Sequence, residues 1–344
     1  MTNSRAGTPR AQTLVAEAAR IADEVLFPAA GVVDGSDRVP VAHLNLLAEA
    51  GLCAMAAPPG EGGLEPEDLA SAGAIVETLA GGCLATTFVW LQHHTAVRAA
   101  AASERDGIRE EWLRPLARGE RRAGIALAGL RSPTAPLRVR PVDGGFRLDG
   151  EAPWVTGWDL IDVLYVAARD ADDLVHFLLV DAAAPAATPT LQVRPLDLVA
   201  VQASRTVNAR FDDHPVPAER LITTQPFDEW SRVDASGSTL NGFLALGVAG
   251  RCLRELGPAA GDSLASELAA CRSDLVAAGA VQTPAVRAVA SELAWRTAAR
   301  LAVTTGSRAV LRDHPAQRLL REAAFLLVFG SRPAIRDELL ARLP

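Results

Sequence analysis

The stretch from Phe211 to Leu221, FDDHPVPAERL, is the most informative part of the chain because two kinds of pattern meet there. On its own it predicts a strand that ends in a proline turn, since proline interrupts a hydrogen-bonded ladder. Before it, apolar and polar residues alternate with a period of two, and after it they recur every three or four residues. This change of period predicts a β domain that passes into a helical one.

The alternation fills the middle of the chain. Leu137 and Val139 alternate with arginines, and the run Asp143-Gly144-Gly145 predicts a tight turn. Two continuous apolar runs, Val163–Ala168 and His176–Val180, predict buried strands. The middle block is therefore expected to be a sheet with a packed interior.

Helical spacing occupies both flanks. Ala72–Leu79 and the segment from Trp90 to Ala102 predict long apolar helices before the sheet. Stripes from Val286 to Leu301 and from Leu319 to Leu326 follow it, and three or four helices are expected there, enough for an antiparallel bundle. The predicted fold class is α+β, in three domains: an N-terminal α-helical domain at 1–118, a middle β-barrel-like or β-sandwich domain at 119–227, and a C-terminal helical bundle at 228–344.

Composition excludes several classes of function. The net charge of −7 argues against nucleic-acid binding, and the 34 basic residues are all arginine, which excludes Schiff-base lysine chemistry. The four cysteines have no paired spacing and are expected to be small buried hydrophobes. His93 and His94 are adjacent, so on a helix they point in different directions and no metal site is expected. The longest apolar run is too short to span a membrane, and the start has no signal-like segment, so a cytoplasmic protein without membrane contact is expected.

Strings in all three blocks resemble the acyl-CoA dehydrogenase family. The stretch from Phe211 to Leu221 is similar to the exit from the family's β domain. The run from Gly145 to Gly157, with Pro153-Trp154-Val155-Thr156-Gly157 at its end, resembles the family's W-x-T-x-G segment. Further resemblances lie at Pro59–Gly63, at Glu77–Ala80 and at His314–Glu322. The resemblance covers nearly the whole chain.

This resemblance implies a flavoprotein that acts on an acyl-CoA or a related thioester. Family members bind FAD between the β domain and the C-terminal bundle. A glutamate removes the α-proton of the thioester while the β-hydrogen leaves as hydride to the flavin. The implied protein is an oligomeric oxidoreductase of lipid metabolism.

The family's cofactor contacts can be carried over residue by residue. Trp154 and Thr156 match positions that contact the flavin ring, through a ring face and through a hydroxyl with its backbone N–H. The second flavin strand is expected at 124–129, where Ala128 and Gly129 replace the usual threonine and glutamate, so only the backbone N–H groups of Leu127 and Ala128 remain. Ser132 and Thr134 follow in place of a glycine-rich loop and are assigned to phosphate or substrate binding.

Two features of the family's active site are missing. The Leu256–Gly261 segment lacks the arginine and phenylalanine that hold the FAD pyrophosphate of a partner subunit, which predicts a weakened cofactor site. The family's base position aligns with Phe329, which cannot accept a proton, and the alternative position near Leu240–Asn241 has no carboxylate either. Glu322 and Asp313 are the carboxylates considered as replacements, each expected to be a surface or helix-capping charge, so the catalytic residue stays unassigned.

Three hypotheses remain open. The chain is an acyl-CoA dehydrogenase-like enzyme, either with a displaced base or as one subunit beside a complete homologue that brings the base. Alternatively, it is a cofactor-free binding or scaffold protein on the same fold. The third hypothesis is a relative of flavin-dependent monooxygenases, whose chemistry requires no glutamate base.

Overall fold

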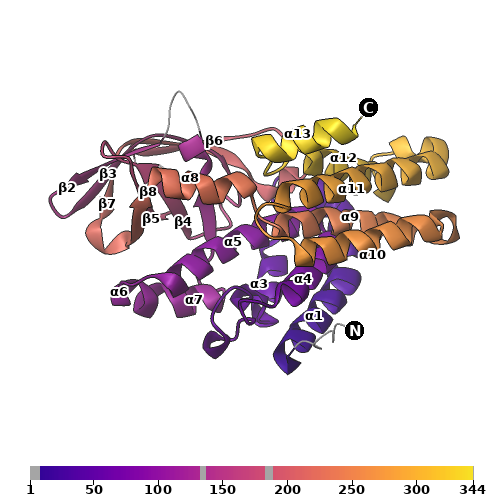
Figure 1. The fold of residues 1–344 in the computed structure, drawn as a ribbon, viewed down its shortest axis with the longest axis horizontal. Helices are drawn as coiled ribbons and strands as arrows, with labels where there is room; N and C mark the ends of the chain where they lie inside the picture. The colour runs from indigo at the N-terminus through magenta and orange to yellow at the C-terminus, as the bar shows by residue number, and fades with distance from the viewer. Residues whose placement is uncertain (1–7, 132–136, 183–188, 344) are drawn as a thin grey trace.

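The computed structural model describes residues 8–131, 137–182 and 189–343, and it confirms the predicted fold class. Helices of the N-terminal block and of the C-terminal block pack against each other, and the sheet lies at one end of the molecule (Figure 1). Helix α5 runs from the helical half to the sheet and so joins the two halves.

The N-terminal block consists of short and long helices with conventional ends. The first helix begins after Thr8, whose hydroxyl accepts a hydrogen bond from the Ala11 N–H, and the fourth begins after Asp68, which caps Ser71 in the same way. Both helices bury their apolar faces in a core shared with the C-terminal block. The helices are α1 (Pro9–Ile21), α2 (Phe27–Asp34), α3 (Val41–Glu49), α4 (Leu69–Gly82), α5 (Leu84–Ala102), α6 (Asp106–Ile108) and α7 (Arg114–Ala117).

The middle block is one mixed sheet whose strands follow the order β6-β7-β3-β2-β4-β5-β8, with β1 paired to β4 in parallel. Alternate residues of β4 belong to different cores: Tyr165 packs in the cluster with Trp112, next to α7, whereas Leu164 packs in the cluster with Phe211 of β7. Both faces of β4 are therefore buried, which explains its uninterrupted apolar sequence. The strands are β1 (Ala123–Ala126), β2 (Arg138–Val142), β3 (Gly145–Val155), β4 (Val163–Arg169), β5 (Leu174–Asp181), β6 (Leu191–Pro195), β7 (Val207–Pro217) and β8 (Leu221–Pro226).

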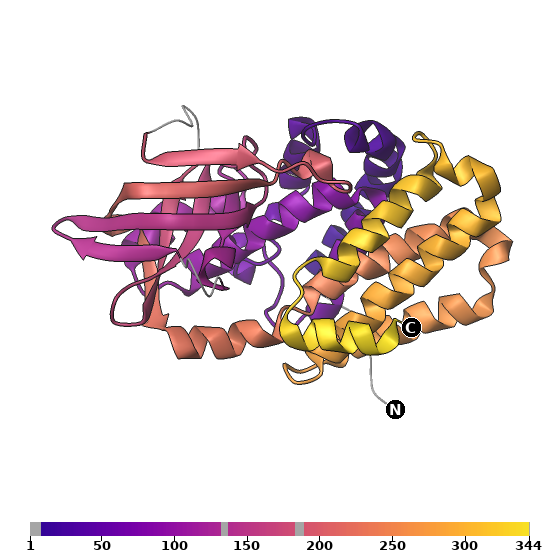
Figure 2. The same cartoon turned by 90° about the horizontal axis from the view of Figure 1, so that it is seen from above.

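The C-terminal block contains four long helices and two shorter ones. Helix α8 leads away from the sheet toward the bundle (Figure 2), and α13 packs against α11 at the end of the chain. The prediction of three or four helices thus matches the long helices and omits the two short ones. The six are α8 (Phe227–Ser236), α9 (Leu240–Leu256), α10 (Asp262–Ala277), α11 (Thr283–Thr305), α12 (Pro315–Val328) and α13 (Pro333–Arg342).

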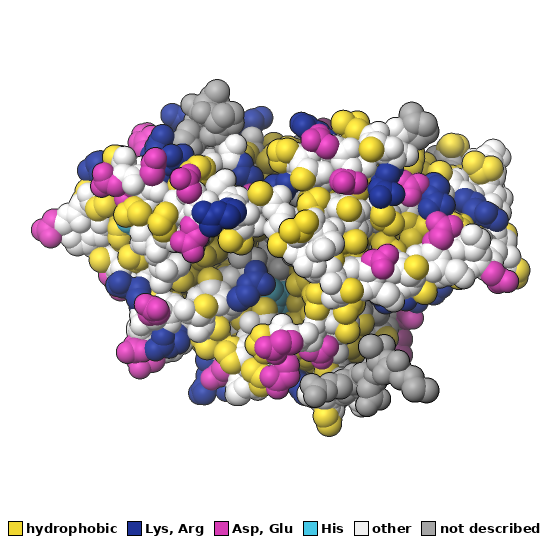
Figure 3. Space-filling model, viewed as in Figure 1, with side chains coloured by type: hydrophobic (Ala, Val, Ile, Leu, Met, Phe, Trp, Pro, Cys, Tyr) yellow, Lys and Arg dark blue, Asp and Glu magenta, His cyan; other side chains and the backbone are white. Residues whose placement is uncertain are grey.

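The surface carries acidic and basic groups side by side. On the face shown in Figure 3, arginines alternate with acidic side chains and no field of a single sign develops. Within the residues that the structure describes, no helix combines the length and apolar character that crossing a bilayer requires.

Candidate functional site

Trp154 is the most unusual residue of the sheet. Its φ of 61° is positive, which costs a bulky residue free energy, and its side chain is 61 % exposed although it belongs to β3. The register of β3 against β7 shifts between Ala152 and Val155, and Asn208 accepts a hydrogen bond from the Trp154 N–H at 3.3 Å. An irregular strand therefore turns a large aromatic ring toward solvent, where a planar ligand can stack on it.

Thr156 lies two residues further on and faces inward. Its hydroxyl is 3.3 Å from the hydroxyl of Thr206, which in turn is 2.8 Å from that of Ser204, and all three side chains are buried. The Thr156 hydroxyl is therefore already engaged in a hydrogen bond within the protein. A ligand above the strand would meet the Trp154 ring before the Thr156 hydroxyl.

The structure brings the two predicted flavin segments together. A Cβ atom on Gly124 would lie 3.0 Å from the Thr156 carbonyl oxygen, and one on Gly129 would lie 2.7 Å from that of Glu151. Because only glycine leaves room for the two backbones to come this close, the 124–129 segment packs directly against the 151–156 segment. Leu127 follows β1 and Ala128 opens a short 3₁₀ turn, both half-buried.

The structure describes only part of the other segments that were assigned to cofactor or substrate binding. Ser132 and Thr134 lie outside the described residues. At the segment that lacks the pyrophosphate arginine, Arg300 of α11 donates a hydrogen bond to the Ala259 carbonyl oxygen at 2.9 Å. An arginine from another helix thus reaches this segment, a contact that sequence spacing did not indicate.

Phe329, at the predicted base position, belongs to an aromatic cluster. Its ring stacks on Phe325 with centroids 5.3 Å apart and meets the edge of Phe88 from α5 at 4.8 Å. The next residue, Gly330, has a φ of 57°. A Cβ atom at this position would point away from the aromatic cluster and lie 3.2 Å from Asn241 Nδ2. The two segments expected to match the family's base positions therefore meet at Gly330 and Asn241, neither of which has a carboxylate.

Arg287 completes this meeting point. It is only 2 % exposed, and its two terminal nitrogens donate to the carbonyl oxygens of Gly330 and Phe329 at 3.0 and 3.2 Å. Its Nε has no hydrogen-bond partner among the described residues. Burial, and to a lesser degree the charge of Arg332, lowers the pKa of Arg287 to about 10, so the guanidinium remains charged at neutral pH.

Asp234 of α8 pairs with two further arginines. Its carboxylate accepts paired hydrogen bonds from Arg131 at 2.7 and 2.8 Å and from Arg332 at 2.9 Å. Burial alone would raise the pKa of Asp234, but the hydrogen bonds and charges of the two arginines outweigh it and hold that pKa below its ordinary value. One carboxylate thus serves two of the three guanidinium groups, and Arg287 has none.

Neither carboxylate considered as a displaced base reaches this site. The expectation of a surface or capping charge is wrong for Glu322, which is 3 % exposed and paired with the buried Arg318 at 2.8 Å. Burial raises the pKa of Glu322, yet the residue lies two helical turns before Phe329, inside the helical core. Asp313 is exposed, as expected.

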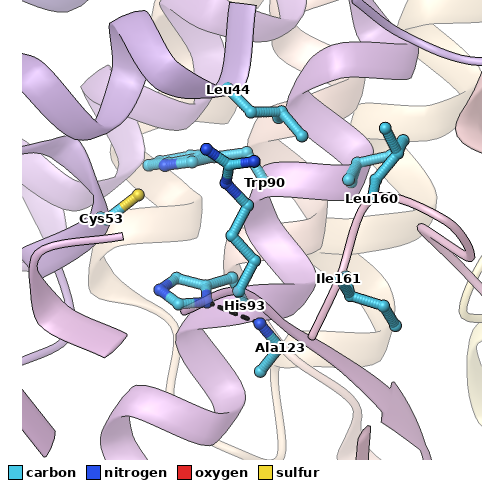
Figure 4. A pocket seen from close by; sticks show the side chains of 9 residues that line it. Leu44, Cys53, Trp90, His93, Ala123, Leu160 and Ile161 are labelled. Carbon is cyan, nitrogen blue, oxygen red and sulfur yellow. Dashed lines mark hydrogen bonds between the residues drawn. The ribbon is translucent and has the colours of Figure 1, made fainter. Parts of the chain in front are cut away.

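A small pocket lies between α3, α5 and β1 (Figure 4). His93 forms part of its wall, with Nδ1 accepting from the Ala123 N–H at 3.1 Å and Nε2 bonded to the Leu116 carbonyl at 2.9 Å. Its volume of about 20 Å³ is enough for roughly one water molecule, so it cannot hold a cofactor. The described residues contain no cluster of metal-ligating side chains.

Comparison with known proteins gives a consistent result. The model of the family described as acyl-CoA dehydrogenase, N-terminal domain, matches residues 8–120. The chain is 26 % identical over 215 residues to the mitochondrial short-chain specific acyl-CoA dehydrogenase of Bos taurus, covering 58 % of this chain and 50 % of that protein. It is also 26 % identical over 239 residues to benzylmalonyl-CoA dehydrogenase of Aromatoleum aromaticum (strain DSM 19018 / LMG 30748 / EbN1), covering 67 % and 63 %. The alignments thus span about half to under two thirds of these relatives.

The fold comparison extends over nearly the whole chain. The solved structure of butyryl-CoA dehydrogenase from Megasphaera elsdenii superposes with a TM-score of 0.82 at 17 % identity, covering 99 % of this chain and 98 % of that one. At this identity the superposition establishes the shared fold alone. Together with the matched N-terminal domain, it shows that this chain resembles acyl-CoA dehydrogenases in its N-terminal domain and shares the fold of butyryl-CoA dehydrogenase.

Proposed function

We propose that this chain binds FAD and an acyl thioester, and that the base for α,β-dehydrogenation comes from a partner chain rather than from its own residues. The observation that carries the proposal is the meeting of Phe329, Gly330 and Asn241 around Arg287, where both family base positions converge without a carboxylate. The ligand platform, by contrast, remains: Trp154 presents an exposed ring on β3, which packs closely against the 124–129 segment.

The residues that would hold the cofactor fit a planar ring with polar edges. The Trp154 ring offers a stacking face, and the segment with Leu127 and Ala128 packs against β3, on which Trp154 lies. When bound, FAD would accept the β-hydrogen of the thioester as hydride. The chain itself would orient the thioester and exclude water, whereas the α-proton needs an acceptor that Asn241 and Arg287 cannot provide, because both present donors.

The first test is an absorbance spectrum of the purified protein after addition of excess FAD and desalting. Retained flavin bands are expected, and they should be weaker in Trp154→Ala than in Trp154→Phe, because phenylalanine keeps a ring face. Val281→Ala, which shortens another exposed apolar side chain in the turn before α11, should retain the wild-type amount. Loss of all flavin from the wild type would favour the cofactor-free hypothesis instead.

The second test addresses the base. Without oxygen, butyryl-CoA is expected to leave the flavin absorbance of the wild type unchanged and to bleach that of Gly330→Glu. The new carboxylate would start beside Asn241, and the cost of a positive φ at Glu is about 1 kcal/mol. Phe329→Glu should disturb the aromatic cluster and give no bleaching. If butyryl-CoA bleached the flavin of the wild-type protein in the absence of any partner chain, the chain would have its own base.

A further inference from the structure

A β-bulge in β3 presents the ring of Trp154. Two residues of β3, Pro153 and Trp154, lie opposite a single residue of β7, Asn208. The regular pairs on the two sides of the bulge are Ala152 with Ala209 and Val155 with Val207. Bulges redirect a side chain of a sheet, and they are frequent next to active sites. The side chain redirected here is the exposed indole of Trp154.

Asn208 supplies the hydrogen bond that the bulge removes from the ladder. Pro153 has no N–H group, so Trp154 carries the one backbone donor of the two bulged residues. That N–H donates to the side-chain oxygen of Asn208, Oδ1, at 3.3 Å. The backbone of Asn208 is fixed from the other side, because β7 pairs with β6 without a shift of register and sets Asn208 opposite Arg194. The acceptor is therefore held by a regular part of the sheet.

The backbone of Trp154 requires such a partner. Its φ of 61° lies in the left-handed region, which a bulky residue adopts only where its surroundings impose it. The indole does little to impose it, because the side chain is 61 % exposed. Asn208, whose neighbours Val207 and Ala209 are both buried, points away from the core and reaches the bulge from its open side. The amide of Asn208 is thus the polar contact that holds the irregular backbone.

We propose that Asn208 is a positioning residue: by accepting the Trp154 N–H it holds the bulge, and with it the ring on which the planar group of the cofactor stacks. This inference rests on the proposed function, because it takes the planar ligand of Trp154 to be FAD. Asn208 acts through Trp154 and makes no contact with the cofactor in this assignment. The orientation of the stacking face is then set by a side chain 54 positions away in the sequence.

A double-mutant cycle on the full chain tests the assignment through the dissociation constant of FAD, measured by titration. Asn208→Leu keeps the size of the side chain but removes the acceptor, and it is expected to weaken FAD binding about tenfold. Asn208→Asp keeps an acceptor and should stay within about threefold of the wild type. In a Trp154→Ala background no ring remains to be positioned, so Asn208→Leu should leave the dissociation constant unchanged there.

Gln192→Leu is the matched control for this cycle. It also replaces an amide by leucine, at an exposed position of the neighbouring strand β6, and FAD binding should stay at the wild-type value. An equal loss of affinity from Asn208→Leu with and without the Trp154 ring would overturn the positioning role. Unchanged affinity of Asn208→Leu in the wild-type background would overturn it as well and leave the proposed function standing.

A second measurement needs no cofactor. Hydrogen exchange of the Trp154 amide is expected to be about tenfold faster in Asn208→Leu than in the wild type, and to return toward the wild-type rate in Asn208→Asp. Equal exchange rates in the three proteins would overturn the positioning role. If the wild type binds no FAD while the exchange rates differ as expected, the proposed function fails and the role of Asn208 in holding Trp154 stands.

Discussion

At the scale of single residues, His93 shows how burial fixes a protonation state. Its Nδ1 accepts from the Ala123 N–H and its Nε2 faces the Leu116 carbonyl, so the neutral ring with the proton on Nε2 satisfies both neighbours. A second proton would point Nδ1–H at another N–H group. Burial lowers the pKa of His93 to about 4, and the same cause also lowers the pKa of neighbouring His94 well below its ordinary value.

This lowered pKa predicts acid sensitivity. The unfolded chain takes up a proton at His93 near pH 6.5, whereas the folded chain does so only near pH 4, so the unfolding free energy falls as the pH drops through this window. His93 alone would contribute about 3 kcal/mol to that loss. Urea unfolding at several pH values between 7 and 4 measures it. His93→Gln keeps a donor for Leu116 but does not titrate, and its loss over the window should be smaller; an unchanged slope would contradict this assignment.

At the scale of elements, α9 crosses α4 so closely that it requires a glycine. A Cβ atom on Gly247 would lie 2.3 Å from the Glu77 carbonyl oxygen, whereas one on Gly250, three residues later on the same helix, would have its nearest contact at 3.7 Å. Gly247→Ala is therefore expected to lower the unfolding free energy by about 1–3 kcal/mol through overpacking. Gly250→Ala should raise it by up to about 1 kcal/mol, since alanine favours helix. Chemical denaturation measures both, and equal effects of the two variants would argue against a close crossing.

Helix α11 shows where sequence periodicity succeeds and where it fails. The predicted stripe included Val286, Val289, Leu293 and Leu301; the structure buries Leu293 and Leu301 but leaves the two valines half-buried. The buried face instead begins with Thr283 and Arg287, four residues apart. A hydrophobic pattern cannot assign an arginine to that face, because the groups that accept its hydrogen bonds are carbonyls at the end of α12, more than 40 residues away.

The same reason limits what could be predicted of the site. Local patterns indicated the strands and the turn at Gly144, because each depends on neighbours in sequence, whereas Trp154 was singled out through the family resemblance. The absence of a carboxylate at Phe329 was also readable from the chain. The convergence of Asn241, Gly330 and Arg287 was not, since three separate helices and loops supply it. The signal that was available is a lone arginine on a helix face otherwise lined by small residues.

At the scale of the whole molecule, Asp234 connects the β domain to the C-terminal block. It lies on α8 and holds Arg131, which follows β1, together with Arg332, which precedes α13. The carboxylate is largely shielded from solvent, so its two paired interactions are worth more than a surface ion pair. The segment around Gly330 is thus positioned by the same carboxylate that holds Arg131 in the turn after β1.

Asp234→Asn is expected to lower the unfolding free energy by about 1–3 kcal/mol at pH 7, because two guanidinium groups lose their shared anion. The folded pKa of Asp234 lies below its ordinary value, so the wild-type advantage is complete above that ordinary value and shrinks as the pH falls through the folded one. Urea unfolding at pH 7, pH 5 and about pH 3 should therefore give equal differences between wild type and variant at the first two values and a smaller one at the third. Glu229→Gln, an exposed change on the same helix, should stay within about 0.5 kcal/mol of wild type throughout. A difference for Asp234→Asn that persists undiminished at the lowest pH would mean that the side chain acts through packing, and the two halves of the molecule would then be joined without this charge.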